Sequence, residues 1–299
     1  MKKCIFFLTT FIFTAIFQFQ VVAQSSQQHL YQVGIMDSLY SKILKEQRKI
    51  WVQVPDDYNP KSDKKYPVIY VLDGSVQMRG LETVHNYYWG HFMPTAILVG
   101  ISNQTNRTRD LTSSEMKMRY GGAVREETGK AEIFTQFLEK ELIPYVDSKY
   151  KTTPYRTLIG HSYGGLFTVN TLINHGHLFE NYLAIDPSLD WDNQKLLKEA
   201  KTKLQNTSFE GKSLFVSLSA ASLDMQNSRI TMDNVMQDTT DYTLFARSII
   251  EFAKFVESQN QNGLNFSWKY YENDLHGTVP LISMRDALIF VFEWYQFKA

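Results

Sequence analysis

The chain has 299 residues, with 31 basic and 31 acidic side chains and a formal net charge of zero. Hydrophobic residues make up 43% of it and aromatic residues 14%, which excludes a disordered or fibrous chain and fits one large globular domain. A neutral chain without a basic block is not expected to bind nucleic acid or to attach electrostatically to a membrane.

The first 23 residues have the pattern of a cleavable signal peptide. A short positive start precedes a mostly apolar stretch that ends in small residues at Ala23. This stretch is too short to cross a bilayer comfortably. We therefore expect cleavage after Ala23, export to the periplasm or secretion, and a mature domain, 24–299, without stable membrane association. An uncleaved membrane anchor is the alternative.

Cys4 is the only cysteine and would be lost with the signal peptide. The mature protein would then contain neither disulfides nor a reactive thiol. A thiol enzyme is therefore not expected.

The mature sequence alternates strand patterns with helix patterns. Apolar or alternating runs predict strands at residues 48–54, 67–72, 95–101, 157–159, 182–185, 214–218 and 266–271. Helical patterns occupy residues 131–143, 163–173, 193–204, 244–256 and 282–295, and Pro144 should end or kink the first of them. This alternation predicts an α/β protein with a mostly parallel sheet covered by helices on both faces.

An aromatic cluster lies between the strands 67–72 and 95–101. It contains Tyr87, Tyr88, Trp89 and Phe92. Because it follows a strand end, where ligands meet an open α/β sheet, it is a candidate wall of a substrate pocket. Ordinary core packing is the alternative.

The segment from Gly160 to Gly164, Gly-His-Ser-Tyr-Gly, follows an apolar run and passes directly into a helical pattern. This is the strand, turn and helix context of a nucleophile elbow. The sharp turn strains the serine backbone, and the two glycines leave room around it. We predict Ser162 as a nucleophile at a strand end, with the Tyr163 N–H as the first oxyanion donor. A structural turn that happens to contain serine is the alternative.

A serine hydroxyl needs an adjacent base, which is usually a histidine held by a carboxylate. Proteins with this elbow carry the three residues in the order serine, acid, histidine. Two of the histidines after Ser162, His175 and His177, lie several turns away at the far end of the next helix. His276, which follows the last predicted strand, is therefore the predicted base, and a histidine in a surface loop is the alternative.

The acid and the second oxyanion donor are harder to place. Asp224 follows the strand 214–218 and lies between the serine and the histidine in the chain, so it is the predicted acid. A dyad without an acid also stays open, as do four other carboxylates: Asp233, Asp238, Asp241 and Asp274. The second oxyanion donor is predicted at Gly74 or Ser75, after the strand 67–72, where an ordinary turn is the alternative.

No cofactor or metal is expected, because no spacing of histidines forms a ligand pattern. The expected partner is a small-molecule ester. The sequence leaves the identity of that ester and the oligomeric state open.

These motifs together resemble a family of esterases in the α/β-hydrolase superfamily that includes enterochelin esterases and esterase D. The resemblance covers nearly the whole mature chain and lies in Tyr66–Gly74, Arg107–Asp110, Glu141–Val146, Gly160–Gly165, Asp186–Leu189 and His276. It implies the α/β-hydrolase fold and hydrolysis of carboxylic esters through an acyl-serine intermediate, with Ser162 and His276 in the matching positions.

The sequence departs from the family pattern in two places. Ser219–Asp224 stands where the family has a glycine and then an acid, and Asp186 stands where a small residue is expected before Pro187-Ser188. The first departure leaves the acid open. A hydrolase-like protein that binds without turnover is therefore an alternative function. A peptidase of the same fold is a further alternative, because the sequence does not discriminate by leaving group.

Overall fold

The computed structural model describes residues 33–119, 122–220, 230–259 and 262–298. The predicted signal peptide, residues 1–23, and the predicted acid Asp224 lie outside the described residues. The described part of the chain belongs to a single compact unit that begins at Val33.

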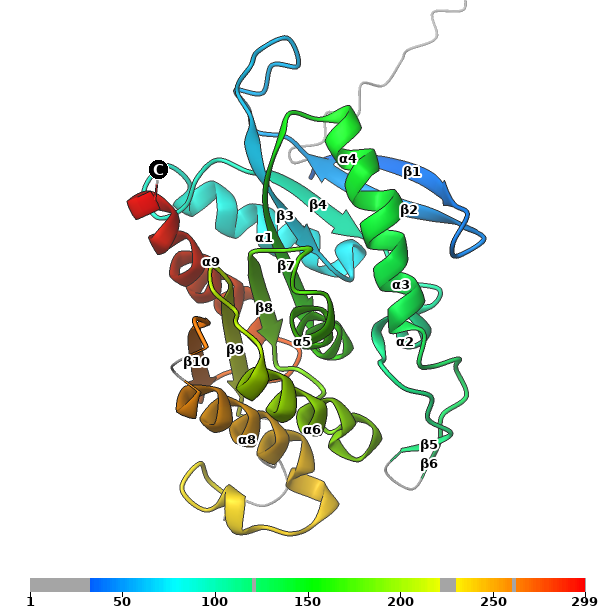
Figure 1. The fold of residues 1–299 in the computed structure, drawn as a ribbon, viewed down its shortest axis with the longest axis vertical. Helices are drawn as coiled ribbons and strands as arrows, with labels where there is room; N and C mark the ends of the chain where they lie inside the picture. Colours follow the sequence, from blue (N-terminus) through cyan, green and yellow to red (C-terminus); the bar gives the residue numbers. More distant parts are fainter. Residues whose placement is uncertain (1–32, 120–121, 221–229, 260–261, 299) are drawn as a thin grey trace, which may run out of the picture. The chain divides into compact units, whose positions relative to one another are not determined.

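A central sheet runs through the described residues in the strand order β1-β2-β4-β3-β7-β8-β9-β10 (Figure 1). From β4 to β10 in this order neighbouring strands are parallel, whereas β2 is antiparallel to both β1 and β4. A separate hairpin pairs β5 with β6. The strands are β1 (Ile35–Ser41), β2 (Glu46–Gln53), β3 (Tyr66–Val71), β4 (Ile97–Ile101), β5 (Met118–Arg119), β6 (Gly122–Ala123), β7 (Thr152–His161), β8 (Asn181–Ile185), β9 (Ser213–Ser219) and β10 (Asn265–Tyr271). The mostly parallel sheet predicted from the sequence is confirmed.

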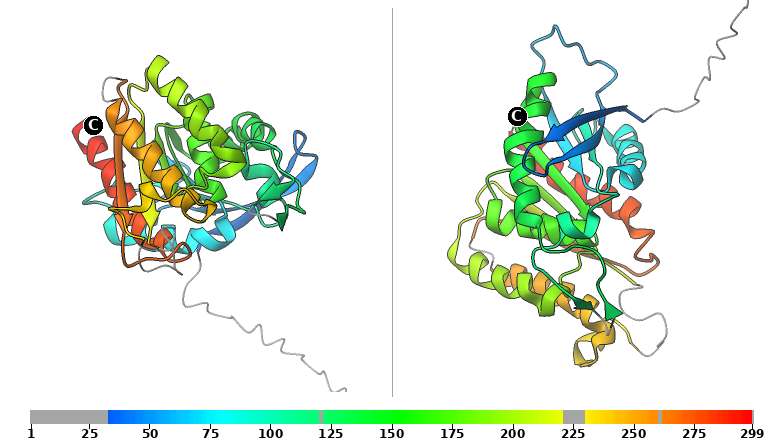
Figure 2. Two further views of the ribbon diagram at one scale, coloured as in Figure 1. Left: turned by 90° about the horizontal axis from the view of Figure 1, so that it is seen from below. Right: turned by 90° about the vertical axis from the view of Figure 1, so that its right-hand side faces the viewer.

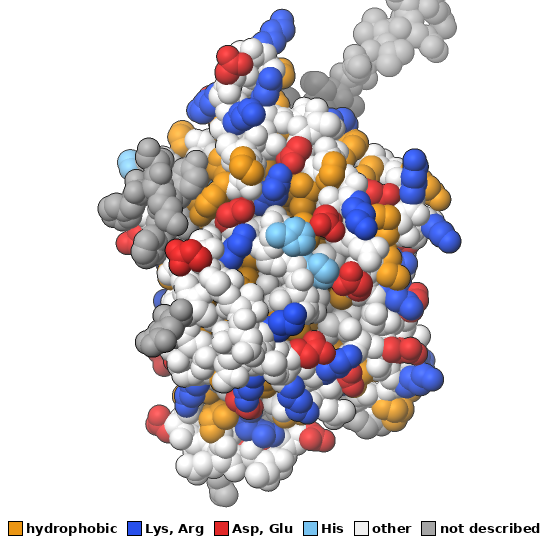
Figure 3. Space-filling model, viewed as in Figure 1, with side chains coloured by type: hydrophobic (Ala, Val, Ile, Leu, Met, Phe, Trp, Pro, Cys, Tyr) orange, Lys and Arg blue, Asp and Glu red, His pale blue; other side chains and the backbone are white. Residues whose placement is uncertain are grey.

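Helices cover both faces of this sheet, as the right-hand view in Figure 2 shows with α4 and α1 on opposite sides. One face carries α1 and α9, and the other carries α3 to α6 and α8. The helices are α1 (Gly74–Tyr88), α2 (Arg107–Leu111), α3 (Ala131–Phe137), α4 (Ile143–Lys149), α5 (Tyr163–His175), α6 (Trp191–Asn206), α8 (Leu244–Ser258) and α9 (Val279–Lys298). On the face seen in Figure 1, acidic and basic side chains are interspersed (Figure 3).

Strand β3 shows why the buried strands have continuous apolar sequences. Val68 and Tyr70 belong to the core cluster on one face, and Ile69 and Val71 belong to the cluster on the other. Successive side chains of a strand point to opposite faces, so a strand covered on both sides needs apolar residues at every position.

The helix predicted at residues 131–143 is longer in the structure. It continues through a π-helical segment, Leu138–Leu142, into α4, which ends at Lys149. Pro144 lies in the first turn of α4. The π-helical segment directly before Pro144 shifts the backbone hydrogen bonds to residues five apart, so the helix accommodates the missing N–H of Pro144 and continues.

The connections of the sheet place several strand ends at one edge. Parallel neighbours β3, β7, β8, β9 and β10 all end at this edge, and α1 and α5 begin there, directly after β3 and β7. The carboxyl edge of a parallel sheet is the place where α/β proteins assemble their ligand sites. All predicted site residues follow one of these strands.

Candidate active site

Ser162 lies in a strained turn between β7 and α5. Its backbone angles are φ 61° and ψ −116°, outside the regions that most residues adopt. A side chain at Gly160 would place its Cβ 2.1 Å from the Gly164 carbonyl oxygen, so this turn requires a glycine there. The structure therefore has the strand, tight turn and helix that were predicted around Ser162.

His276 is held by a buried carboxylate, Asp186. Its Nδ1 lies 2.7 Å from Asp186 Oδ2, and the aspartate side chain is 0% exposed whereas the histidine is 40% exposed. Asp186 follows β8, and its φ of 44° lies in the left-handed region. The aspartate therefore lies at the same sheet edge as Ser162, on the neighbouring strand.

The end of β9 fixes the Asp186 carboxylate. The Ser219 N–H donates to Oδ1 at 3.0 Å, and the Ser219 hydroxyl donates to Oδ2 at 2.6 Å. The Asp186 N–H is in turn bonded to the Ser217 carbonyl oxygen, at 3.2 Å. A buried carboxylate is stabilised only when donors surround it, and these bonds leave Asp186 Oδ2 directed at the histidine.

Contacts with adjacent residues of the chain hold His276 and Ser162 near each other. The His276 ring packs against His161, with ring centroids 4.5 Å apart, and the Ser162 N–H donates to the Ile185 carbonyl oxygen at 3.0 Å. No hydrogen bond joins Ser162 to His276 in the described part of the chain. The hydrogen bonds of a catalytic site are often long without substrate and shorten when it binds.

His161 is an uncharged side chain that packs against the His276 ring. Burial, reinforced by the positive charge that His276 can carry, lowers the pKa of His161 to about 4. Its Nε2 is buried and has no hydrogen-bond partner among the described residues. His161 therefore stays uncharged near neutral pH and supports the His276 ring by contact.

This lowered pKa predicts an acid-sensitive contribution to stability. An unfolded histidine binds its proton near pH 6.5, so the unfolded state gains protons before the folded state as the pH falls. The contribution of His161 should be complete above pH 6.5 and decline as the pH falls towards 4. Urea unfolding at several pH values should show a smaller loss of unfolding free energy for His161→Gln than for the natural protein. Parallel curves for the two proteins would contradict this assignment.

Two helices begin at the residues predicted to donate to an oxyanion. Tyr163 opens α5, and Gly74 and Ser75 open α1, directly after Asp73. The first N–H groups of a helix have no partner within it, so they can bind an oxyanion. A Cβ on Gly74 would lie 2.5 Å from the Gly100 carbonyl carbon, which explains the glycine. The strands before these helices are neighbours, as the prediction of a shared oxyanion hole requires.

The alternative acids are exposed or are bonded to other residues. Asp233 and Asp241 are exposed, and Asp238 and Asp274 bind the hydroxyls of nearby threonines. In the described part of the chain, none of these four carboxylates bonds to His276. Sequence reasoning missed Asp186 as the histidine's partner, although it had noted an unusual aspartate there.

The predicted position of the aromatic cluster was wrong. Helix α1 begins at the carboxyl edge of the sheet and runs back along it, so Tyr87, Trp89 and Phe92 lie at the opposite edge from Ser162. They are substantially exposed, at 81%, 48% and 51%. A cavity of about 220 Å³ beside them is lined by Trp89 and by His85, not by any residue of the candidate site.

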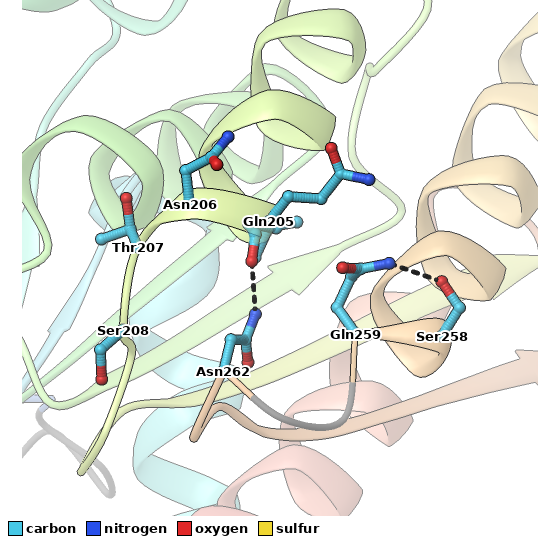
Figure 4. A pocket seen from close by; sticks show the side chains of 8 residues that line it. Gln205, Asn206, Thr207, Ser208, Ser258, Gln259 and Asn262 are labelled. Carbon is cyan, nitrogen blue, oxygen red and sulfur yellow. Dashed lines mark hydrogen bonds between the residues drawn. The ribbon is translucent and has the colours of Figure 1, made fainter.

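A polar hollow lies between the ends of α6 and α8 (Figure 4). Its lining is neutral and consists of Leu204, Gln205, Asn206, Thr207, Ser208, Ser258, Gln259 and Asn262. Asn262 closes one side by donating to the Leu204 carbonyl oxygen at 3.1 Å. These residues precede β9 and β10, so the hollow lies at the amino edge of the sheet.

The described residues also bear on metal binding and on membrane insertion. No group of three or more histidine, cysteine, aspartate or glutamate side chains there could hold a metal ion. Within the same residues, no helix is both long enough and apolar enough to cross a membrane.

Comparison with known proteins identifies the family. The family model described as "Putative esterase" matches residues 41–276. Ferri-bacillibactin esterase from Bacillus subtilis is 29% identical over 209 residues, which are 64% of this chain and 72% of that protein. Apo-salmochelin esterase from Escherichia coli is 30% identical over 152 residues, which are 47% of this chain and 46% of that protein.

Solved structures agree with this assignment. An IroE-like serine hydrolase from Shewanella oneidensis has a TM-score of 0.75 and 30% identity, over 87% of this chain and 80% of that one. Siderophore hydrolase EstB from Aspergillus nidulans has a TM-score of 0.70 over 89% of this chain and 97% of that one, and its 22% identity shows a likeness of fold alone. These comparisons confirm the α/β-hydrolase fold and the carboxylic ester hydrolase predicted from the sequence. The chain therefore belongs to this family of serine esterases.

Proposed function

We propose that this esterase uses Ser162 as its nucleophile, His276 as its base and Asp186 as the acid of the triad. The observation that carries the proposal is the short bond between His276 Nδ1 and the buried Asp186 carboxylate, beside a serine in a strained elbow. The acid then follows β8 instead of β9, where Asp224 was predicted.

The geometry supports a specific proton path. Because the Asp186 carboxylate accepts a hydrogen bond from Nδ1–H, the other ring nitrogen, Nε2, is left unprotonated and can accept the Ser162 proton. Ser162 Oγ then bonds to the ester carbonyl carbon, whose oxygen takes the negative charge. The Tyr163 N–H and an N–H from Gly74 or Ser75 stabilise this oxyanion.

In the steps that follow, His276 donates the proton that it has accepted. His276 returns the proton to the leaving alcohol as the carbon–oxygen bond of the ester breaks and the acyl-serine forms. A water molecule then gives its proton to His276 and attacks the acyl carbon. The acyl–Ser162 bond breaks, Ser162 regains its proton from His276, and the carboxylic acid leaves.

The substrate class is proposed from relatives and from the walls of the site. Several relatives are named as esterases or hydrolases of siderophores, so we propose a siderophore ester as the substrate. An aromatic side chain flanks the catalytic histidine: Phe245 meets the His276 ring edge-on, with the ring centroids 5.5 Å apart. Such a contact surface favours an acyl group or an alcohol with an aromatic ring.

Export is the remaining part of the proposal. The positive start and the apolar stretch before Ala23 support removal of a signal peptide and action in the periplasm or outside the cell.

The test is hydrolysis by the mature chain, residues 24–299, of a short-chain aryl ester, the matching anilide, and siderophore esters with and without iron. We expect the esters to be cleaved and the anilide to resist. Mass spectrometry after treatment with a fluorophosphonate should place the label on Ser162. Cleavage of the anilide at a comparable rate would favour a peptidase, and labelling without turnover of any ester would favour a binding protein.

A further inference from the structure

Arg107 connects the two segments that supply the oxyanion donors. The oxyanion loop, Asp73–Ser75, follows β3, and the nucleophile elbow, His161–Tyr163, begins at the last residue of β7. Arg107 Nε donates to both carboxylate oxygens of Asp73, at 2.9 and 3.0 Å, and its Nη2 donates to the His161 carbonyl oxygen at 3.1 Å. One side chain from α2 thus bridges both segments.

Arg107 also lies against the residue that carries the first oxyanion donor. Its guanidinium carbon is 5.2 Å from the centroid of the Tyr163 ring. A planar guanidinium can bind a carboxylate along one edge and a carbonyl along another while it stacks on an aromatic face. A lysine has a single ammonium and cannot make all three contacts from one position.

Asp73 makes the charge of Arg107 important. Its side chain is only 11% exposed, and its Oδ2 lies 3.7 Å from the place where a Cβ on Gly164 would be, at the start of α5. An uncompensated carboxylate at this position would oppose the negative charge that develops on the substrate oxygen, and the low dielectric of a buried site strengthens that repulsion. The ion pair with Arg107 cancels it.

We propose that Arg107 is a positioning residue that holds the oxyanion loop against the nucleophile elbow and neutralises Asp73. In this arrangement the N–H of Tyr163 and that of Gly74 or Ser75 converge on one substrate oxygen. The inference rests on the proposed function, because it concerns the oxyanion hole of the same reaction.

Arg109 provides a matched control on the same short helix. It binds Glu46 at 2.7 Å and Asp110 at 2.7 Å, and so ties α2 to β2, and among the described residues its side chain makes no hydrogen bond to the elbow. It resembles Arg107 in charge, pairing and partial burial, with side chains 15% and 31% exposed respectively. Replacing each by lysine therefore separates an effect on the oxyanion hole from a general loss of an ion pair.

The experiment measures kcat and KM on a short aryl ester, together with the Kd of an arylboronic acid that forms a tetrahedral adduct with the serine. Because a small displacement of catalytic groups costs roughly 10²-fold in rate, Arg107→Met should lower kcat by about that factor and weaken boronate binding in parallel, with KM little changed. Arg107→Lys should fall between this variant and the natural protein. Arg109→Lys should leave kcat, KM and the boronate Kd unchanged.

Three outcomes would overturn the inference. A raised KM with an unchanged kcat in Arg107→Lys would make Arg107 a substrate contact, and equal losses in Arg107→Lys and Arg109→Lys would make it a structural ion pair. Unchanged kinetics in both Arg107→Lys and Arg107→Met would show that Arg107 has no role in the site. A natural protein that neither hydrolyses esters nor binds the boronate would instead refute the proposed function. Thermal unfolding of every variant shows whether a loss of rate is a loss of fold.

Discussion

Replacing Ser162 or His276 by alanine is expected to lower kcat for a short aryl ester by roughly 10⁶-fold, the loss found when a member of a serine–histidine unit is removed. The serine cannot attack without losing its proton, and without Ser162 the histidine has no nucleophile in the elbow to activate. The two residues therefore act as one unit, and the double variant should be no slower than either single variant.

His175→Ala is the matched control for these two variants. His175 also follows the serine in the chain, but it lies at the far end of α5 and pairs with Glu132 at 2.8 Å. Its replacement should change kcat by no more than about twofold, as expected for a surface change away from the chemistry. Substantial activity in His276→Ala, or a double variant much slower than both single variants, would show that the two residues do not form a unit.

The parts of the site that the sequence predicted are those with a local signal. The Gly-x-Ser-x-Gly spacing identifies the turn at Ser162 because the steric demands of that turn act between residues two positions apart. His276 followed from chain order and from the distance of His175 and His177 along a helix. The buried strands were equally predictable, because a strand covered on both faces needs apolar residues throughout.

The partner of His276 had no comparable local signal. Asp186 and His276 are 90 residues apart in the chain, and only the packing of β8 beside β9 and β10 brings them together. Chain order and the usual strand pointed to Asp224. The useful signal was that the sequence departs from the family pattern at two strand ends. Ser219–Asp224 does not have the usual glycine followed by an acid, and Asp186 brings a carboxylate to a strand end where a small residue is expected.

Direction along a helix explains the error about the aromatic cluster. Tyr87 and Trp89 come soon after a strand that ends at the active edge, but they stand at the far end of the helix that follows it. Helix α1 has 15 residues, and at 1.5 Å per residue it carries the chain about 22 Å back across the sheet. A residue at the start of such a helix, such as Gly74, lies at the site, and one at its end lies at the other edge.

Asp186→Asn is expected to lower kcat by roughly 10⁴-fold while KM changes little. The asparagine keeps the size of the side chain and can still bond to Ser219, but its amide can donate to His276 Nδ1. That bond stabilises the tautomer in which Nε2 carries the proton and cannot accept one from Ser162. The fold should survive, because no buried charge is created.

Asp224→Asn and Asp274→Asn are the comparison that decides where the acid lies. If Asp186 orients His276, both variants should retain kcat within about threefold, since a change away from the reacting groups moves the barrier little. Asp186→Glu should recover part of the rate lost in Asp186→Asn, because it restores a carboxylate at a slightly different distance. A 10⁴-fold loss in Asp224→Asn with a nearly normal Asp186→Asn would instead place the acid after β9. Small effects in all of these variants would mean that Ser162 and His276 work as a dyad.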